Sequence, residues 1–280
     1  SRISLRNLRD ELKDSTERGL IPGCVIVVVE KGDIKWAEAF GSRQLYPTQE
    51  AMTLDTIFDL ASLTKVVATL PAIFHLVDKG LLSLDSCLKE FFPKSNDIPI
   101  GDVTIAQLLT HTSGLSARTY LKQYGETKYE MVNGIISSML DYEIGSKVSY
   151  SNRGFILLGE IVEKISGESL FDYVQKNVWS KAEMHETTFA PYDQEYLLRV
   201  APTEYRDEIQ SCLKGIVHDE NAALLGGIAG HAGVFSSAND LVHFCNMIMD
   251  KGFYNRAEIL SEQLVTKSMK NHTNSLNEAR

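Results

Sequence analysis

The chain has 280 residues, of which 44% are hydrophobic and 23% charged, enough for one large domain or two smaller ones with a hydrophobic core. Its 37 acidic and 28 basic side chains give a formal net charge of −9, and no basic run stands out, so we expect no nucleic-acid partner. No run of about 18 or more consecutive apolar residues is present, and we therefore expect no membrane span.

The four cysteines are scattered along the chain with no C-x-x-C pair: Cys24, Cys87, Cys212 and Cys245. Four cysteines in a chain of this size do not make a disulfide scaffold, and they favour a reducing compartment. The first residues do not resemble a signal peptide. We expect either a cytoplasmic protein or a mature secreted form whose signal peptide has been removed. The cluster of His218, Asp219 and Glu220 lacks the H-E-x-x-H spacing, and we expect neither a metal nor another cofactor.

The first 60 residues predict a helix and then a β-hairpin. Leucines at helical spacing mark an amphipathic helix over residues 5–19. The β-branched run 24–29 and the segment 34–40 flank a turn at 31–33, which is the pattern of a hairpin. The first strand is apolar on both faces, so both faces should be covered. Because a lone two-stranded sheet is marginal in water, its partner strands must lie in unrecognised segments or outside this chain.

Beyond the hairpin the chain predicts mostly helices, which places it in the α+β class. Apolar residues recur at three- and four-residue steps in the following segments: 63–77, 105–109, 135–140, 157–165, 170–178 and 241–248. Leu264 and Val265 mark a last helix. Pro71 removes one backbone donor from the first of these helices. Ser237 or Asn239 is the expected start of the helix over 241–248, and Ser261 is the expected cap of the last one. Residues 190–222 show little periodicity.

Ser62 and Lys65 form an S-x-x-K sequence at the point where the extended segment 57–60 runs into the first of these helices. The spacing places Ser62 at the helix N-terminus and Lys65 one turn further on, on the same side. This is the arrangement of serine acyl-transfer enzymes. An N-cap serine followed by a surface lysine is the structural alternative, and the tetrapeptide alone does not decide between the two.

Tyr150, Ser151 and Asn152 precede another apolar helix and offer a base and a hydrogen-bonding group for Ser62. In an extended segment Tyr150 and Asn152 point the same way, because side chains alternate with a period of two. Tyrosine and lysine have similar reference pKa values, so in a partly dry pocket each can hold the other in its reactive form. Either a Lys65 ammonium favours a Tyr150 phenolate, or a neutral Lys65 accepts the serine proton. A tyrosine in a surface turn is the structural alternative.

The two motifs together resemble the serine β-lactamase and penicillin-binding-protein superfamily, in particular its class C β-lactamase and esterase branch. The resemblance covers nearly the whole chain. It is carried by the following segments: Phe58–Lys65 (FDLASLTK), Leu108–Leu115 (LLTHTSGL), Tyr150–Asn152 with Gly154 and Leu157–Glu160, Met184–Phe189, Val217–Ala222 and Gly230–Ala238.

This resemblance implies a single β-lactamase/transpeptidase-like domain over residues 1–280, with an antiparallel sheet flanked by helices and an all-helical subdomain. Residues 1–60 would form the N-terminal part of the α/β subdomain. Residues 61–235 would form the mainly helical subdomain, with the nucleophile helix at its start. Residues 236–280 would return as helices toward the α/β subdomain.

The resemblance also implies roles for single residues. Ser62 would be the acylated nucleophile, and its backbone N–H would form half of an oxyanion hole at the positive end of its helix. Lys65 and Tyr150 would share the general-base and general-acid work. Asn152 would bind the amide or carbonyl of the substrate. The segment His111–Leu115 would shape the helical half without taking part in the chemistry.

One family feature is missing from the sequence. The superfamily carries a third motif, Lys-Thr-Gly or His-Thr-Gly, on a late strand that borders the pocket and supplies the second oxyanion donor. His231–Gly233 runs directly into the predicted cap at Ser237 and resembles the loop ahead of that helix. We therefore interpret the chain as a truncation whose C-terminal strands, with the third motif, lie beyond Arg280. Exchange of strands with a second copy is an alternative way to complete the sheet.

The implied activity is that of a serine hydrolase acting through an acyl-enzyme on Ser62. The substrate would be an ester, a β-lactam or a D-amino-acid peptide of the peptidoglycan type. The expected pocket walls, residues 116–130 and 190–215, do not select among them. The alternative is a non-catalytic or truncated penicillin-binding-like protein that binds such molecules without turning them over.

Overall fold

The N-terminal hairpin predicted from the sequence is present. A computed structural model describes residues 2–280 of the chain. In it, β1 (Gly23–Glu30) pairs antiparallel with β2 (Asp33–Gln44), and β2 pairs with β3 (Glu50–Ala51). The β1–β2 register shifts between Val28 and Val29, and such a bulge strengthens the local twist.

The other strands of residues 2–280 are short, and they form sheets in the orders β4–β8–β5, β6–β7 and β10–β9. Their bounds are β4 (Ile57–Asp59), β5 (Thr188–Phe189), β6 (Tyr205–Arg206), β7 (Ser211–Cys212), β8 (Val234–Ser237), β9 (Phe253–Tyr254) and β10 (Ala257–Glu258). The α-helices are α1 (Arg2–Glu17), α2 (Leu70–Asp78), α3 (Ile105–Leu109), α4 (Lys128–Ser137), α5 (Asn152–Ser166), α6 (Leu170–Val174), α7 (Gln194–Leu198), α8 (Glu220–Leu224), α9 (Ala238–Met249) and α10 (Glu262–Ser268).

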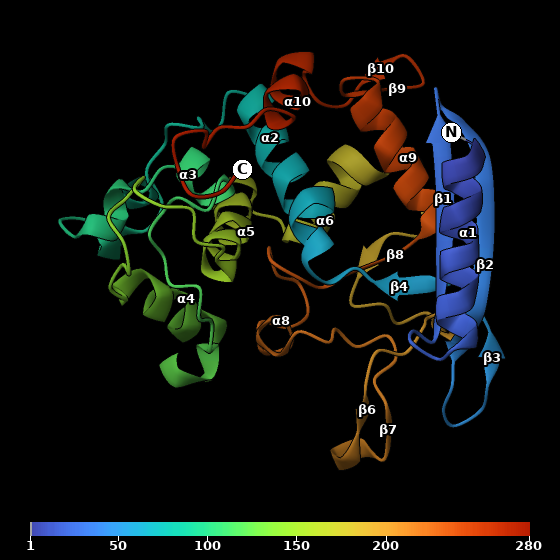
Figure 1. Ribbon diagram of the computed structural model, residues 1–280. Helices are drawn as coiled ribbons and strands as arrows, with labels where there is room; N and C mark the ends of the chain where they lie inside the picture. The colour runs from blue at the N-terminus through green and yellow to red at the C-terminus, as the bar shows by residue number, and fades with distance from the viewer. Residues whose placement is uncertain (1) are drawn as a thin grey trace.

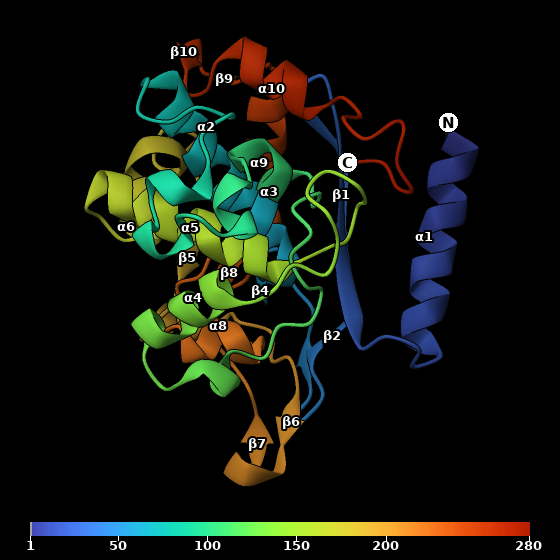
Figure 2. The same cartoon turned by 90° about the vertical axis from the view of Figure 1, so that its left-hand side faces the viewer.

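A helix lies against each face of the hairpin, but the cover is incomplete. α1 lies on one side and α9 on the other (Figures 1 and 2). Arg9 of α1 pairs with Glu38 of β2, with Nε and Oε1 2.9 Å apart. The β1 residues up to Val29 are only half-buried, and a groove of about 980 Å³ separates β1 from α9. One edge of β1 has no partner strand in the described part of the chain. The expectation that both faces are covered is therefore met only in part.

The central strand of the second sheet, β8, was not predicted from the sequence. It lies between β4 and β5, pairing Phe58 with Ser236 and Phe189 with Val234. All four β8 residues are buried, so they show no alternation of apolar and polar side chains. This sheet places the end of β4, and with it the S-x-x-K segment that follows, beside residues 230–237 of a distant part of the chain.

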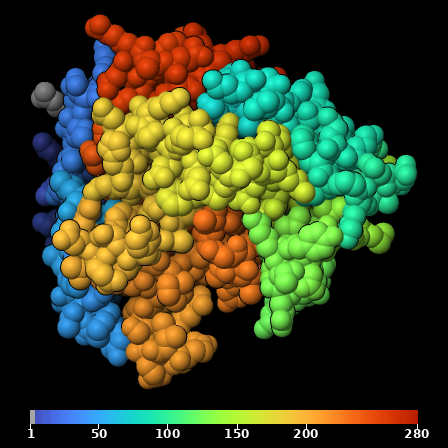
Figure 3. All heavy atoms as spheres, turned by 180° about the vertical axis from the view of Figure 1, so that it is seen from behind, coloured from blue at the N-terminus to red at the C-terminus, as the bar shows by residue number. Residues whose placement is uncertain are grey.

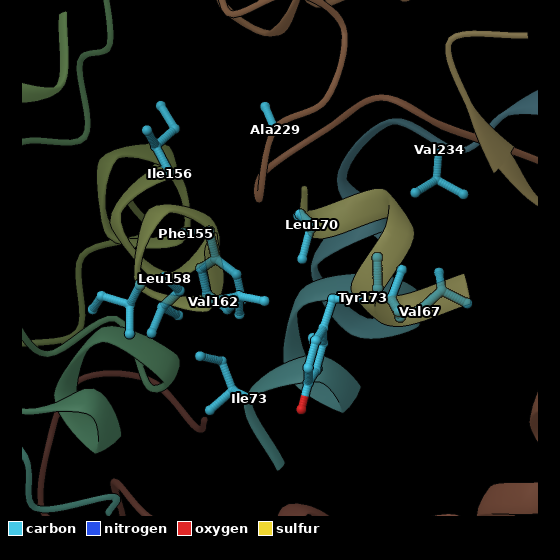
Figure 4. Packing of buried hydrophobic residues seen from close by; sticks show 14 of the residues in the cluster. Val67, Ile73, Phe155, Ile156, Leu158, Val162, Leu170, Tyr173, Ala229 and Val234 are labelled. Atoms are coloured by element: carbon cyan, nitrogen blue, oxygen red, sulfur yellow. The ribbon is translucent and has the colours of Figure 1, made fainter. Parts of the chain in front are cut away.

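The helical body is built on α2, α5 and α6, whose apolar side chains meet in one core (Figure 4). The stretch 61–78 is long and apolar enough to cross a membrane by length and composition, with a mean hydropathy of 1.2 over 18 residues. This stretch contains the helix that the sequence predicts over residues 63–77. Because 61% of it is buried inside the protein, its surroundings are those of a core helix. Seen from behind, the segments of α5 and α6 form a band across the molecule (Figure 3).

Helix α4 differs most from its predicted position. Apolar spacing predicts a helix around 135–140, whereas α4 spans Lys128–Ser137. Its start is a capping box, in which Thr127 Oγ1 accepts from the Glu130 backbone N–H and the Glu130 side chain accepts from the Thr127 N–H. The T-x-x-E sequence at residues 127–130 could have predicted this helix start. By contrast, Ser237 and Ser261 cap α9 and α10 as predicted.

Candidate active site

Ser62 lies in a tight turn where β4 ends. Residues Ala61–Leu63 form a 3₁₀ turn that runs directly into the following helix, and Ser62 is exposed. Ala61 has a φ of 48°, a left-handed conformation that is uncommon outside glycine. Its N–H donates to Asp59 Oδ1 at 2.8 Å, which holds the turn. The N-cap position belongs to Leu60 and has no side-chain capping bond. The structural alternative of a capping serine is therefore wrong.

Lys65 begins a π-helical stretch, Lys65–Thr69, that precedes α2. Pro71 stands in the first turn of α2 and has no N–H to donate. The π-helical stretch therefore ends next to the place where the proline interrupts the hydrogen bonds of the helix. Such π turns are frequent at functional sites. The stretch turns Lys65 inward, and its side chain is 4% exposed. The alternative of a surface lysine is wrong as well.

The Lys65 amine joins the two sequence motifs. Its Nζ lies 3.2 Å from Ser62 Oγ and 2.5 Å from the Tyr150 hydroxyl oxygen. A third contact, at 3.3 Å, is with the backbone carbonyl of His231. Burial lowers the pKa of Lys65, and the hydrogen bond and charge of Tyr150 oppose that shift only in part. The neutral amine is therefore more accessible here than in a lysine exposed to water.

Tyr150 stands at the open side of this cluster. Its side chain is 39% exposed, and the Lys65 Nζ lies 4.6 Å from the centre of its ring. The C-terminal segment reaches the same place (Figure 1). Asn277 exchanges two hydrogen bonds with the backbone of Val148, at 2.8 and 3.0 Å, and the Arg280 guanidinium carbon lies 5.7 Å from the Tyr150 ring centre. The polarity of residues 271–280 was visible in the sequence, but this contact was not.

Asn152 is not part of the extended segment, which corrects the sequence analysis. The extended backbone ends at Ser151, the N-cap residue of α5, and Asn152 is the first residue of that helix. The predicted alternation of Tyr150 and Asn152 along one strand is therefore wrong. Asn152 is half-buried, and its Oδ1 is buried without a hydrogen-bond partner among the described residues. An unpaired buried acceptor is uncommon in proteins and calls for a donor.

Hydrogen bonds join the segment 230–234 to the nucleophile turn and to the start of the helix that follows it. The Leu60 N–H donates to the Val234 carbonyl at 2.8 Å, and the Val234 N–H donates to Thr64 Oγ1 at 3.1 Å. Thr69 Oγ1 donates to the Gly230 carbonyl at 2.7 Å. A Cβ on Gly230 would meet the Phe155 carbonyl oxygen at 2.0 Å, so glycine alone permits this close approach. Strand β8, the loop before it and the S-x-x-K turn are thus joined by several hydrogen bonds.

A pair formed by buried His231 and half-buried Asp219 was not singled out from the sequence. His231 is 1% exposed, and its Nε2 lies 2.7 Å from Asp219 Oδ1. Burial alone would raise the pKa of Asp219, but the bond to His231 and the nearby charges outweigh it and the pKa is lowered. Asp219 also caps α8 by accepting from the Ala222 N–H at 2.7 Å. The cluster considered for metal binding is split, since His218 Nε2 lies instead 3.2 Å from Glu204 Oε2.

Comparison with known families accounts for this arrangement. The family model described as Beta-lactamase matches residues 8–278. The chain belongs to the β-lactamase family. Its sheets with their covering helices and helical body form a β-lactamase-like fold, as expected from the sequence motifs. The His231–Gly233 segment lies in the buried loop before β8, in agreement with the expectation that it precedes the α9 helix.

Three relatives of this β-lactamase family chain illustrate the match. An N-acetylmuramyl-L-alanine amidase of Bacillus subtilis (strain 168) is 30% identical, over 94% of this chain and 67% of the relative. A proposed D-alanyl-D-alanine carboxypeptidase of Escherichia coli (strain K12) is 28% identical, over 87% of this chain and 64% of the relative. The crystal structure of a class C β-lactamase from Rhodobacter sphaeroides superimposes with a TM-score of 0.77 at 22% identity, over 93% of this chain and 69% of that chain. The chain thus spans about two thirds of the length of the curated relatives it matches.

Proposed function

We propose that this β-lactamase family chain is a serine hydrolase that forms an acyl-enzyme on Ser62. The observation that carries the proposal is the position of Lys65 Nζ, within hydrogen-bonding distance of both Ser62 Oγ and the Tyr150 hydroxyl. A nucleophile, a buried amine and an ionisable hydroxyl in contact are the elements of activated-serine catalysis. Ser62 and Tyr150 are both exposed, so a substrate carbonyl can reach them.

The proposed chemistry begins with a proton transfer. Ser62 Oγ attacks the carbonyl carbon of the substrate while its proton passes to neutral Lys65. Burial lowers the pKa of Lys65, and this makes the neutral form accessible. When the tetrahedral intermediate collapses, the Tyr150 hydroxyl gives its proton to the leaving group and takes one back from the Lys65 ammonium. Water then attacks the acyl-enzyme. Tyr150 and Lys65 take a proton from the water and return one to Ser62 Oγ, which releases the acid product.

Two further groups of the site would hold the substrate. The Ser62 backbone N–H lies in the turn at the start of a helix, where the helix dipole favours a developing oxyanion. The unpaired Oδ1 of Asn152 is suited to an amide N–H of the substrate. Such a donor is present in a peptide and in the side-chain amide of a β-lactam, but not in a simple ester.

For the substrate class we propose an amide of the peptidoglycan type, namely a short peptide ending in D-amino acids or a muramyl peptide. The names of the two curated relatives, an amidase and a carboxypeptidase, support this class. β-Lactams are mimics of the same acyl donor and are the second candidates. Esters follow as the least demanding substrates, because their leaving group needs less help from Tyr150.

The test combines acylation with turnover. Purified protein is treated with a penicillin and with a fluorophosphonate, and the intact mass is measured beside that of Ser62→Ala. Hydrolysis of a D-alanyl-D-alanine peptide, nitrocefin and a p-nitrophenyl ester is then followed. The proposal expects one adduct on Ser62 and turnover of at least one substrate. Binding of peptidoglycan fragments with no adduct and no turnover would instead identify a binding protein on the same scaffold.

A further inference from the structure

His111 contacts the Tyr150 ring and binds the backbone on both sides of Tyr150. Its ring lies 4.5 Å from the Tyr150 ring, centre to centre, at an interplanar angle of 33°. Its carbonyl accepts a hydrogen bond from the Ser149 N–H at 2.8 Å. Its Nδ1 accepts one from the Ser151 N–H at 3.1 Å. The backbone on both sides of Tyr150 and the Tyr150 ring itself are therefore held by one residue.

These three contacts of His111, here called the clamp, require one tautomer of the neutral imidazole ring. Nδ1 accepts a hydrogen bond, so in the neutral ring the proton is on Nε2. The ring is 6% exposed and lies between Tyr150 and Phe155, whose ring centre is 5.3 Å away. Burial, with the charges of Arg280 and Lys65, lowers the pKa of His111 to about 4. The accepting form is therefore kept at neutral pH.

His111 holds this position in an uncommon backbone conformation. Its φ is 58°, in the left-handed region where glycine, asparagine, aspartate and histidine occur more readily than other residues. Strained backbone of this kind persists where the surroundings determine it, and it is concentrated at active sites. A residue needed only to fill space would not require a ring acceptor at this place.

We propose that His111 is a positioning residue that fixes the Tyr150 hydroxyl against the Lys65 amine for proton transfer. The proposal rests on the proposed function, because it gives Tyr150 a task in acylation. His111 makes no hydrogen bond with Ser62 or Lys65 among the described residues, whereas it contacts the Tyr150 ring and the backbone on both sides of Tyr150, so we expect its effect to pass through Tyr150. The segment containing His111 was given only a packing role from the sequence, and this proposal replaces that interpretation.

Two substitutions separate the acceptor from the rest of the clamp. His111→Asn keeps an acceptor oxygen near the place of Nδ1, and His111→Gly removes it. Both residues accept a positive φ, so the backbone strain is matched. Each is made in the wild type and in Tyr150→Phe. The maximal rate of Ser62 acylation by a penicillin, whose ring nitrogen needs a proton as it leaves, and the half-saturating concentration are measured on the full chain, with thermal unfolding as a check of folding.

The expected result is a loss that depends on Tyr150. His111→Gly should lower the maximal acylation rate by roughly 10–100-fold, the scale of a small misplacement of a catalytic group, with little change in the half-saturating concentration. His111→Asn should recover a large part of that rate. In the Tyr150→Phe background neither change should reduce the rate further, because the group that His111 positions is already gone.

Three results would overturn the proposal. One is a wild-type acylation rate for His111→Gly. A second is an equal loss in the Tyr150→Phe background, which would show a general structural effect. The third is a wild-type rate for Tyr150→Phe itself, which would remove Tyr150 from the proposed function and leave His111 nothing to position. The first two leave the proposed function intact, so the two failures are distinguishable. If His111→Gly does not fold, the same comparison is made with His111→Ala, which also lacks the ring acceptor.

Discussion

Lys65 Nζ and the Tyr150 hydroxyl oxygen are 2.5 Å apart, although 85 residues separate them in the sequence. The contact is made where the S-x-x-K turn faces the N-cap of α5. It places a buried amine, 4% exposed, beside a hydroxyl that is open to solvent. A proton taken from Ser62 can therefore pass through the buried Lys65 amine to the exposed Tyr150 hydroxyl, and each part of this path is open to mutation.

Lys65→Met should abolish acylation of Ser62 with a change in unfolding free energy within about 1 kcal/mol. Methionine keeps the apolar stem and approximate volume, and burial is what lowers the pKa of Lys65. The apolar side chain removes the cost of burying the amine, and this gain offsets the lost hydrogen bonds to Ser62, Tyr150 and the His231 carbonyl. Acylation rate and guanidinium unfolding measure the two effects. Acylation at the wild-type rate would remove Lys65 from the proposed mechanism.

Tyr150→Phe should lower the turnover of amide substrates by about 10²–10⁴-fold, the usual contribution of a general acid or base. The loss should be smaller for a p-nitrophenyl ester, whose leaving group departs without a proton. Stability should hardly change, because Tyr150 is 39% exposed. Steady-state rates on both substrates provide the check. Equal losses on amide and ester would contradict a role of Tyr150 in protonating the leaving group.

Thr64→Val should destabilise the protein by about 1–3 kcal/mol, because the Val234 N–H would be left buried without an acceptor. Thr64→Ser is the matched control, since it keeps the hydroxyl and removes one methyl group. The unfolding free energies of the three proteins are compared by denaturant titration. If Thr64→Val and Thr64→Ser lower the unfolding free energy equally, the hydrogen bond between the nucleophile turn and β8 makes no net contribution to stability.

The stability of the protein should fall in acid in a way that depends on His111. Unfolded chains bind a histidine proton below about pH 6.5, whereas the folded protein binds it at His111 only near pH 4, because of burial and the charges of Arg280 and Lys65. Stability is therefore lost as the pH falls through this window. The wild type should lose roughly 3 kcal/mol more than His111→Asn between these values. Parallel pH curves for the two proteins would contradict this.

The comparison with His111→Asn isolates one titration. His75 is also buried, and burial lowers its pKa as well, but it titrates in both proteins and its contribution cancels. The groups that face the His111 ring, namely Lys65, Tyr150 and Arg280, are unchanged by the substitution. Unfolding by urea at a series of pH values gives both curves.

The elements that local rules describe were predictable from the sequence. The β1–β2 hairpin follows from a β-branched run and its turn, and the starts of α9 and α10 follow from Ser237 and Ser261. These signals lie within a few neighbouring residues. The strand β8 gave no such signal, because it has four buried residues whose partners, β4 and β5, lie far away in the sequence.

The site was predictable to the extent that its motifs are local. Ser62 and Lys65 were named from their spacing, and Tyr150 from its place in an extended segment ahead of an apolar helix, with the family resemblance adding to both. The start of α5 at Asn152 was misplaced because helix boundaries are the least certain part of a prediction. Two further features arise from contacts between segments far apart in the sequence: the Asp219–His231 pair and the clamp of His111 on Tyr150. The clamp uses a backbone carbonyl and a ring nitrogen acceptor, and neither leaves a pattern in the sequence.

The most direct test of the account is the intact mass of the protein after reaction with a fluorophosphonate, compared with Ser62→Ala. The account predicts a single adduct that maps to Ser62 and is absent from the variant. The variant should be folded, with an unfolding free energy within about 0.5 kcal/mol of the wild type, because Ser62 is exposed and caps no helix. An unmodified wild-type protein, or an adduct that persists in Ser62→Ala, would contradict the assignment of Ser62 as the nucleophile.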